Sequence, residues 1–256
     1  MNRSPTIAAI YRYPVKGLSA ESLVSTRLAA GQTIAADRLY AIENGPSGFD
    51  PAAPAYLPKQ RFLMLMRNER LARLQARFDA ATHVLAIELE GARVASGDLR
   101  TPAGRASIEG FFAEFCADEL RGPPRVLHGG GHSFSDVARK VVSIINPASV
   151  AAIEKAVGAP VDPVRFRGNL YVAGWPAWHE FSLMDREIGI GSAARVKIVK
   201  RIRRCAATEV DPLTAARDLP IPGTLLRAFG HGDCGVYAEV MAGGEIAVGD
   251  AVAESD

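Results

Sequence analysis

The chain has 256 residues, of which 30 are lysine or arginine and 28 are aspartate or glutamate, so its formal charge is only +2. A chain of this length can bury a large apolar core in one large or two modest domains. The balanced charge argues against a protein that binds nucleic acid or an anionic lipid surface through its overall charge, so any anion site must be a local cluster of basic residues.

The first half of the chain is predicted to consist mainly of β-strands. Several short segments alternate between apolar and polar residues or are rich in β-branched and aromatic residues; they are Thr6 to Tyr13, Ser22 to Leu28, Arg38 to Glu43, Leu71 to Phe78 and Val84 to Leu89. Tyr11 and Arg12 interrupt the apolar stretch in the first segment, and no run in the chain approaches the length of a membrane span. We therefore expect a cytoplasmic protein with neither an export leader nor a membrane anchor.

A proline-rich segment from Asn44 to Pro58 separates two of these strands. Its four prolines can continue neither a helix nor a central strand, so it is predicted to be a loop. A connection of this length without secondary structure is either disordered or covers a site. Both alternatives are open, and the second makes the segment a candidate lid.

Two helices are predicted near the middle of the chain. Between Ala106 and Leu120 the apolar residues recur at helical spacing, which places Cys116 in the core. A second helix is predicted to begin at Asn146-Pro147, because asparagine is a good N-cap and proline suits the first helical position. Gly158 is then expected to end this helix.

The glycine-rich run from His128 to His132 lies between the two predicted helices. Its three glycines predict a flexible loop, and we place the domain boundary there, with one domain over residues 1–127 and another over residues 128–256. The same glycines oppose the helix that two histidines four residues apart need in order to share a metal ion, so a metal site is disfavoured.

The second half is predicted to return to strands, and these are Asn169 to Ala173, Val196 to Ile202, Val236 to Met241 and Ile246 to Val252. The last two flank Gly243-Gly244 and are expected to form a hairpin. The predicted fold class is therefore α+β and predominantly β, with a β-barrel or sandwich in the first half and inserted helices in the second.

The three cysteines form no C-x-x-C pair, which argues against a zinc ribbon, an iron–sulfur cluster and a disulfide-stapled scaffold. Cys205 ends the run Arg201-Ile202-Arg203-Arg204-Cys205, the densest positive charge in the chain. If the preceding strand is regular, Arg201, Arg203 and Cys205 share one face, where the charge would favour a thiolate able to act as a nucleophile or a soft-metal ligand. A buried cysteine beside solvated arginines fits these residues equally well.

Three smaller clusters also place basic residues where an anion could bind. Arg167 and Asn169 lie two residues apart, and together they would suit a phosphate. Lys16-Gly17 and Asp37-Arg38 place cations at a turn and at the start of a strand. Each cluster alone is also explained by solvated surface charge.

Taken together and in this order, the motifs resemble the MOSC family, which is named for the C-terminal domain of molybdenum-cofactor sulfurase; they are YPVKG (13–17), DRLY (37–40), FSD (134–136), FRGN (166–169), RCAATEVDP (204–212) and GGEIAVGD (243–250). The resemblance covers nearly the whole chain, because the first half is similar to the β-barrel domain that precedes MOSC in the mitochondrial amidoxime-reducing molybdoenzymes. It implies a MOSC N-terminal β-barrel domain followed by a MOSC β-barrel domain with inserted helices.

The resemblance also implies a molybdenum cofactor, molybdopterin, in the cleft between the two domains, with Cys205 at the position of the molybdenum ligand. The first domain has Lys16, Gly17 and Arg38 at positions that contact the pterin and its phosphate. The positions matched in the second domain are Asp136, suited to accept hydrogen bonds from pterin N–H groups, and Arg167, Asn169 and Arg204.

Some other residues near these motifs are assigned a role in shaping the site. Others depart from the family pattern. Thr208 and Asp211 are expected to shape the turn after the ligand through bonds from side chain to backbone. Val137-Ala138-Arg139 stand where the reductases have proline and small polar residues. Cys234 matches no family ligand and is either a core residue or a second thiol near the site.

Two functions fit this pattern. The first is an oxidoreductase in which molybdenum accepts an oxygen atom from a small N-hydroxylated compound. Since the chain has no four-cysteine cluster, dinucleotide fingerprint or haem motif, its electrons would come from a separate flavoprotein, ferredoxin-like or cytochrome b5-like donor. The second is a carrier, in which Cys205 holds a persulfide or the cleft holds the cofactor for delivery. Neither a nucleic acid nor a membrane is an expected partner.

Overall fold

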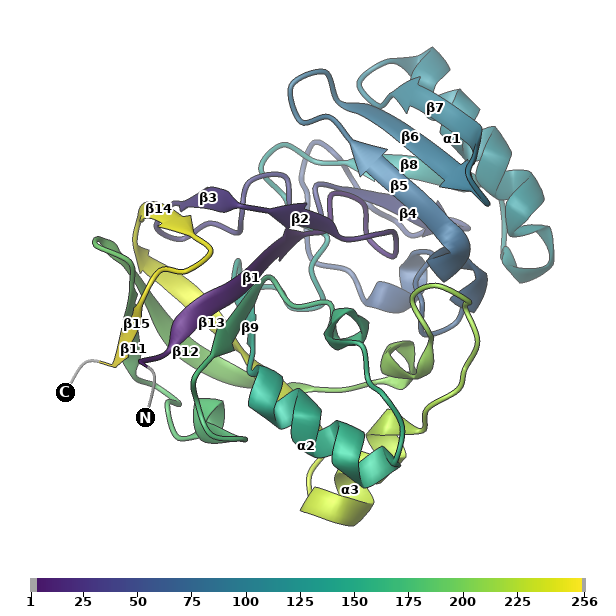
Figure 1. The fold of residues 1–256 in the computed structure, drawn as a ribbon. Helices are drawn as coiled ribbons and strands as arrows, with labels where there is room; N and C mark the ends of the chain where they lie inside the picture. The colour runs from purple at the N-terminus through teal and green to yellow at the C-terminus, as the bar shows by residue number, and fades with distance from the viewer. Residues whose placement is uncertain (1–3, 255–256) are drawn as a thin grey trace.

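The computed structural model describes residues 4–254, and strands are its main elements, as predicted. One large curled sheet dominates the lower part of Figure 1. Its eight strands are, in spatial order, β15 (Val252–Glu254), β11 (Glu187–Ile190), β12 (Ala194–Arg203), β13 (Asp233–Ala242), β9 (Val142–Ile145), β10 (Leu170–Ala173), β1 (Thr6–Arg12) and β2 (Glu21–Leu23). The inward-facing aliphatic residues of this sheet form the larger of the cores.

The rest of the first half forms smaller sheets in the upper part of Figure 1. One sheet pairs β4 (Tyr40–Asn44) with β8 (Pro124–His128), and another contains β5 (Leu74–Phe78), β6 (Val84–Leu89) and β7 (Ala92–Asp98). The helix α1 (Pro102–Phe115) packs on β7 and β8. Fully buried Leu85, Ile87 and Phe112 belong to the core between these elements.

Strands from the two halves of the chain pair directly with one another. Ile10 of β1 lies opposite Leu170 of β10 in an antiparallel pair, and β3 (Ser25–Leu28) pairs with β14 (Gly244–Ala247). Segments on both sides of residue 128 therefore build the same β-structure and fix the position of one half against the other. The division into domains at residues 127 and 128 stays a prediction.

The local signals for the second helix predicted it correctly. The helix α2 (Pro147–Val157) has Asn146 as its N-cap, whose side chain accepts a hydrogen bond from the backbone of Ala148, and it ends at Gly158 with a φ of 75°. Only glycine adopts such a left-handed conformation without strain.

The first helix begins earlier than predicted, at Pro102 instead of Ala106, because Thr101 caps it through a bond from the Gly104 N–H. It ends at Phe115, and Cys116 is buried as predicted. A third helix, α3 (Ile221–Phe229), was not predicted, and neither were the strands β7, β9 and β11. Short 3-10 helices complete the fold; they are η1 (Lys59–Arg61), η2 (Glu69–Arg73), η3 (Ala117–Glu119), η4 (Pro163–Phe166), η5 (His179–Phe181) and η6 (Ala206–Glu209).

The predicted hairpin at Gly243-Gly244 is wrong. The strand after these glycines, β14, pairs with β3 from the first half, while β13 pairs with β12 and β9. A Cβ atom on Gly243 would lie 2.7 Å from the Leu28 carbonyl oxygen, and one on Gly244 would lie 2.9 Å from the Ala194 nitrogen. The glycines therefore allow backbones distant in sequence to approach closely, a need that the local sequence does not reveal.

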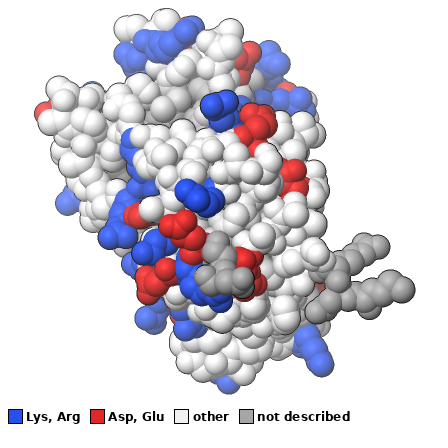
Figure 2. All heavy atoms as spheres, turned by 90° about the vertical axis from the view of Figure 1, so that its left-hand side faces the viewer, with Lys and Arg blue, Asp and Glu red and all other residues white. Residues whose placement is uncertain are grey.

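Within residues 4–254 no helix is long and apolar enough to cross a membrane. The face of the molecule seen in Figure 2 has basic and acidic side chains intermingled among neutral residues.

Candidate functional site

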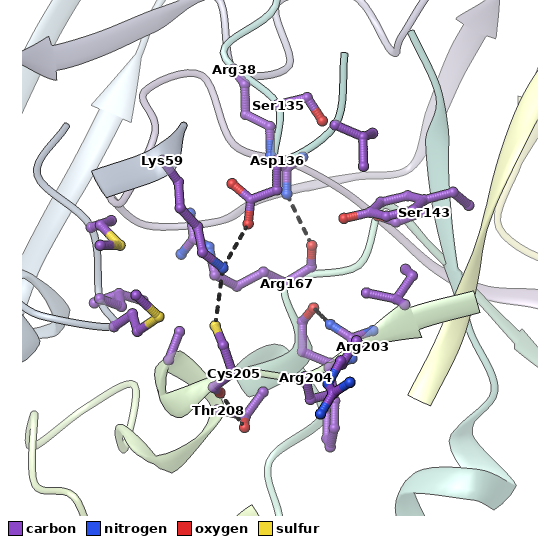
Figure 3. A pocket seen from close by; sticks show the side chains of 18 of the residues that line it. Arg38, Lys59, Ser135, Asp136, Ser143, Arg167, Arg203, Arg204, Cys205 and Thr208 are labelled. Carbon is purple, nitrogen blue, oxygen red and sulfur yellow. Dashed lines mark hydrogen bonds and ion pairs between the residues drawn. The ribbon is translucent and has the colours of Figure 1, made fainter. Parts of the chain in front are cut away.

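A pocket of about 240 Å³ is lined by residues of both halves of the chain. All eight site residues predicted from the sequence line it, namely Lys16, Gly17, Arg38, Asp136, Arg167, Asn169, Arg204 and Cys205. The structure thus brings together positions that are up to 189 residues apart, from Lys16 to Cys205. Figure 3 shows Lys59, Asp136 and Cys205 meeting in this pocket.

Cys205 is the only thiol that lines the pocket in the described chain. It directly follows Arg204, after the end of β12, and is partly exposed, whereas Cys116 and Cys234 are fully buried. Burial raises the pKa of each of these two thiols to about 12. Both are therefore inert core residues. Of the two alternatives for Cys234, a core residue or a second thiol near the site, the structure shows the core residue.

The turn after Cys205 is held by hydrogen bonds to the cysteine's own carbonyl oxygen. Thr208 donates to it from its hydroxyl at 2.9 Å and from its backbone N–H at 3.0 Å. The predicted side-chain-to-backbone bond is therefore present. Because these bonds use only the backbone of Cys205, they leave its sulfur free to face the pocket.

Lys59 supplies the cation next to the sulfur. Its ammonium nitrogen lies 3.3 Å from the Cys205 sulfur and 3.6 Å from an oxygen of Asp136 (Figure 3). Burial acts to lower the pKa of Lys59, but Asp136 and Cys205 more than offset it and raise that pKa. The sequence did not single out Lys59, because one lysine after a proline-rich loop carries no local sign of a site.

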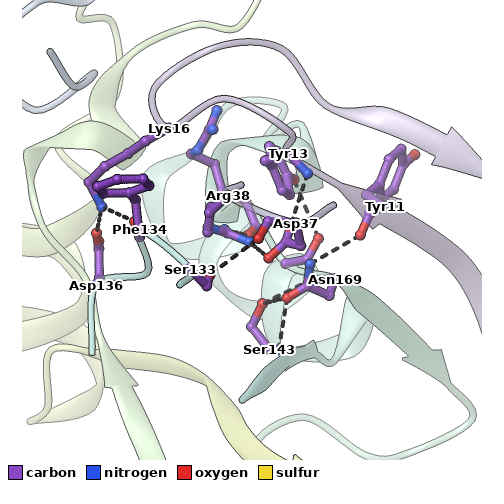
Figure 4. Close-up of polar contacts among 12 residues, drawn as sticks. Tyr11, Tyr13, Lys16, Asp37, Arg38, Ser133, Phe134, Asp136, Ser143 and Asn169 are labelled. Carbon is purple, nitrogen blue, oxygen red and sulfur yellow. Dashed lines mark hydrogen bonds and ion pairs between the residues drawn. The ribbon is translucent and has the colours of Figure 1, made fainter. Parts of the chain in front are cut away.

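Lys16 holds the other side of the Asp136 carboxylate. Its ammonium group donates to one oxygen of Asp136 and, at 2.9 Å, to the Phe134 carbonyl (Figure 4). Burial raises the pKa of Asp136, yet Lys16 and Lys59 outweigh it and the pKa is lowered well below the usual range. Burial lowers the pKa of Lys16, and its partner Asp136 opposes that shift. Asp136 is thus an ionised carboxylate clamped between two cations.

Tyr13 is a buried platform for two arginines. The guanidinium of Arg167 lies 4.3 Å from the centre of its ring and that of Arg38 lies 4.7 Å away. Burial raises the pKa of Tyr13 to about 12, so the ring stays neutral and attracts both cations through its π face. Arg38 is further bound to Asp37 and to the Arg167 carbonyl at 3.1 Å.

Arg167 differs from Arg38 because its guanidinium forms no hydrogen bond or ion pair with any described residue. Its backbone takes a left-handed conformation with a φ of 50°, just after η4, and its side chain lines the pocket over Tyr13. Burial lowers the pKa of this guanidinium, and Tyr13, Asp136 and Asp37 offset that effect only in part. An anion in the pocket would offset the rest.

Two other predicted residues serve mainly to join elements. Arg204 donates to the Phe166 carbonyl at 2.8 Å and to the Cys234 carbonyl at 2.7 Å, and thereby ties η4 to β13. Asn169 is 2% exposed and accepts from Ser143 while donating to the Tyr11 carbonyl at 3.1 Å (Figure 4). Both line the pocket, but their polar groups are already largely occupied by the protein.

Gly17 has a φ of 85° in the tight turn after Lys16, and a Cβ atom there would lie 2.8 Å from the Leu63 carbonyl oxygen. The glycine is therefore required by the backbone that aims Lys16 at Asp136.

Arg165 was not predicted, and it clamps the segment that follows Cys205. Its side chain is 2% exposed and binds Asp218 through two nitrogens, each at 2.8 Å, and Asp211 at 2.9 Å. It also donates to the Glu209 carbonyl at 3.1 Å. Asp211 caps the same turn by accepting from the backbone of Thr214 at 2.7 Å, which agrees with the turn-shaping role expected for it.

The strand before Cys205 is not regular, as the prediction of one shared face assumed, although Arg201, Arg203 and Cys205 all line the pocket. The strand β12 has an irregular register between Arg201 and Arg203. The guanidinium of Arg201 lies 3.9 Å from the centre of the Phe181 ring and pairs with Asp233 at 3.1 Å. Arg203 is exposed.

The pocket lining is strongly basic. Nine cationic residues face two acidic ones, Asp37 and Asp136; the cations are Lys16, Arg38, Lys59, Arg165, Arg167, Lys200, Arg201, Arg203 and Arg204. Six of the nine have hydrogen-bond or ion-pair partners within the protein, and the side chains of Arg167, Lys200 and Arg203 have none in the part of the chain that the structure describes. The chain's overall charge is nearly zero, so this excess of positive charge is local to the pocket. It suits an anionic ligand.

The proline-rich segment leads into this site. Phe49 packs against Phe134, with ring centres 4.9 Å apart, and the Tyr56 hydroxyl donates to the Asp136 carbonyl at 3.3 Å. The segment therefore lies beside the pocket and ends just before Lys59. His128 and His132 contact aromatic rings instead of each other, and residues 4–254 contain no group of three or more His, Cys, Asp or Glu that could hold a metal ion.

Comparisons with solved structures give weak likenesses. The structure of YiiM from Geobacillus stearothermophilus is 16% identical, with 45% of this chain and 54% of that chain covered and a TM-score of 0.35. The structure of the YuaD protein from Bacillus subtilis is 13% identical, with 98% of this chain and 94% of that chain covered and a TM-score of 0.47. No curated protein sequence matches the chain.

Models of protein families give a definite assignment. The model of the MOSC N-terminal beta barrel domain matches residues 4–116, and the model of the MOSC domain matches residues 124–253. The two matches together span almost all of the chain and have the order that the sequence motifs predicted. The chain therefore belongs to the MOSC family, with the N-terminal β-barrel domain of that family ahead of its MOSC domain.

Proposed function

We propose that the chain binds the molybdenum cofactor, molybdopterin, with Cys205 as the metal ligand, and that it is an oxidoreductase which removes an oxygen atom from N-hydroxylated compounds. The MOSC family is associated with this cofactor. The observation that carries the proposal is a partly exposed thiol, Cys205, in a basic pocket where the other thiols of the described chain take no part.

The donor set of the pocket fits such a group. A thiolate is a soft ligand of the kind that molybdenum takes, and Cys205 is the one thiol that lines the pocket within residues 4–254. The guanidinium of Arg167, which has no described polar partner, would bind the anionic phosphate, and the Asp136 carboxylate would accept from pterin N–H groups. Lys16 and Lys59 would hold Asp136 in place.

When bound, the cofactor supplies the exchange of two electrons and an oxygen atom, and the protein supplies binding, orientation and charge. Lys59 donates a hydrogen bond to the Cys205 sulfur, which stabilises negative charge on that atom. The bonds from Thr208 fix the backbone of Cys205 and so the direction of its side chain. The proline-rich segment, which precedes Lys59, flanks the pocket and would restrict the access of water and substrate.

The electrons would come from a separate protein. The sequence carries no four-cysteine cluster, dinucleotide fingerprint or haem motif that could hold a second redox group. The donor is therefore expected to be a flavoprotein, a ferredoxin-like protein or a cytochrome b5-like protein.

The test combines metal content with turnover. The full chain is produced in a host that makes the cofactor, its molybdenum is measured by elemental analysis, and benzamidoxime reduction is followed with a chemically reduced viologen as the donor. We expect nearly stoichiometric molybdenum and formation of benzamidine. Absence of molybdenum from the purified protein would refute the proposal.

A carrier function is the alternative outcome of the same experiment. A carrier would hold the cofactor loosely, so that gel filtration removes it, or would release cyanide-labile sulfur from Cys205, and in both cases benzamidoxime would not be reduced.

Replacing Arg167 by alanine is expected to weaken cofactor binding about 10- to 100-fold, because the loss of a charge-assisted hydrogen bond costs about 1.5–3 kcal/mol. Replacing Arg167 tests the anion site more directly than replacing Lys16, since removal of Lys16 also takes away an ion-pair partner of the Asp136 carboxylate. The measurement is molybdenum retained after serial dilution and filtration. Arg100→Ala, which changes an exposed arginine outside the pocket, is the control. Equal retention in the two variants would remove Arg167 from the anion site.

Shortening the proline-rich segment is expected to change substrate selectivity without changing the molybdenum content. A short Gly-Ser linker in place of residues 49–54 keeps Ser47, which binds the buried Glu43, and also Tyr56 and Lys59. If the segment is a lid, the ratio of kcat/KM for small and bulky N-hydroxylated compounds will shift, because substrate positioning changes. An unchanged ratio at equal molybdenum content would show that the segment is a surface connection.

A further inference from the structure

Lys59 and Cys205 form a lysine–cysteine pair in direct contact within the pocket. The lysine nitrogen and the cysteine sulfur lie 3.3 Å apart, at hydrogen-bond distance. Such pairs are candidates for an oxidative cross-link, because one oxygen atom inserted between nitrogen and sulfur needs only a small movement of either side chain.

The fold holds both ends of the pair in place. On the lysine side, the Arg61 N–H donates to the Pro58 carbonyl at 3.0 Å and the Phe62 N–H donates to the Lys59 carbonyl at 3.1 Å. On the cysteine side, Thr208 binds the Cys205 carbonyl. Asp136, 3.6 Å from the lysine nitrogen, keeps the ammonium group at this end of the pocket. The backbone positions of both residues are therefore fixed, and Asp136 favours a lysine rotamer that reaches the sulfur.

The pair is also open to small oxidants. The side chain of Lys59 is 24% exposed, Cys205 is partly exposed, and both line a pocket that solvent enters. Thiol oxidation in proteins follows exposure and a cationic surrounding. Cys116 and Cys234 lack both exposure and a neighbouring lysine, so oxidation is directed to Cys205.

We infer that Lys59 and Cys205 become joined by a covalent nitrogen–oxygen–sulfur bridge when the metal-free protein meets dioxygen. One thiol, one amine and one dioxygen yield the bridge and one water: the S–H bond and one N–H bond break, and S–O and O–N bonds form. Dioxygen is the oxidant and takes up four electrons, with one of its oxygen atoms entering the bridge. The lysine ammonium group must first lose a proton to solvent before its nitrogen can form a bond. The reaction is therefore slow.

The bridge is a redox switch for the pocket. Its sulfur is bonded to oxygen and can no longer act as a thiolate ligand, and the proline-rich segment becomes tied through Lys59 to the turn at Cys205. Four electrons from a thiol reductant, such as two molecules of dithiothreitol, restore the thiol and the amine and release the oxygen as water. This inference does not rest on the proposed function, because it concerns the metal-free protein alone.

The test is mass spectrometry of the metal-free full chain after days in air-saturated buffer. We expect a gain of about 14 Da, one oxygen less two hydrogens, which dithiothreitol reverses. Because modified Lys59 resists trypsin, digestion should yield residues 39–61 linked to residues 205–217.

Two variants separate the bridge from other oxidation. Lys59→Arg keeps the positive charge but removes the amine, and should abolish the gain and the linked peptides. Lys200→Arg alters another lysine that lines the pocket and should leave both unchanged. The inference is overturned if the wild type gains only about 16 or about 32 Da, which marks sulfenic or sulfinic acid, or if the gain of about 14 Da persists in Lys59→Arg.

Discussion

Cys205→Ala is expected to abolish molybdenum retention while leaving the fold intact. The expected loss is complete, because Cys205 is the only thiol that lines the pocket within residues 4–254, so the variant has no thiolate bond from the protein to the metal. The fold should survive because the turn after Cys205 depends on the cysteine carbonyl, which binds Thr208, and not on the sulfur. The measurements are elemental analysis of protein from a cofactor-producing host and the free energy of unfolding in urea.

Cys116→Ala is the matched control for this variant. It also removes one thiol, but from the core of the first half, so it should lower the stability and keep the metal. Cys205→Ser adds a nearly isosteric test, since a hydroxyl preserves the size and not the softness of the ligand. Molybdenum at the wild-type level in Cys205→Ala would refute the ligand assignment, whatever the behaviour of the two other variants.

The parts of the fold that sequence reasoning predicted are those with local causes. Asn146, Pro147 and Gly158 fix the ends of α2 by capping and backbone conformation, and these effects act within a few residues. The pairing of β3 with β14 joins residues more than two hundred positions apart, so nothing near Gly243 distinguishes a turn from a close approach of backbones. The local pattern favoured the hairpin, and the tertiary structure overrode it.

The candidate site likewise contains residues that the local sequence indicated and residues that only the tertiary structure revealed. Cys205 stood out because arginines surround it in sequence, yet the cation beside its sulfur is Lys59, which lies 146 residues away. Arg165 was missed for a similar reason, since its carboxylate partners come from the later segment that holds Asp211 and Asp218. The family resemblance in residue type and order predicted eight of the residues that line the pocket, whereas the division between free and paired charges depends on tertiary contacts.

Arg165→Met is expected to destabilise the fold by about 3 kcal/mol, because removing one partner from a buried ion-pair network leaves the others uncompensated. The value lies at the low end of the usual range, since Asp211 and Asp218 keep exposures of 22% and 41% and water can partly solvate them. Methionine keeps much of the side-chain volume, so the loss reports on the polar contacts more than on a cavity. Urea unfolding of the metal-free protein measures it.

Arg195→Met gives the matched comparison, because Arg195 is 62% exposed and lies 3.9 Å from Glu187 on the surface. Such a pair contributes about 0–1 kcal/mol, so this variant should have nearly the stability of the wild type.

The position of Arg165 leads to a second expectation, which concerns the metal. Its clamp orders the segment after Cys205, so the metal should dissociate faster from Arg165→Met even below the urea concentrations that unfold it. Equal stability of the two arginine variants would show that the ion pairs of Arg165 contribute no more than an exposed ion pair. The segment after Cys205 would then be held only by the backbone bonds around Thr208 and Asp211.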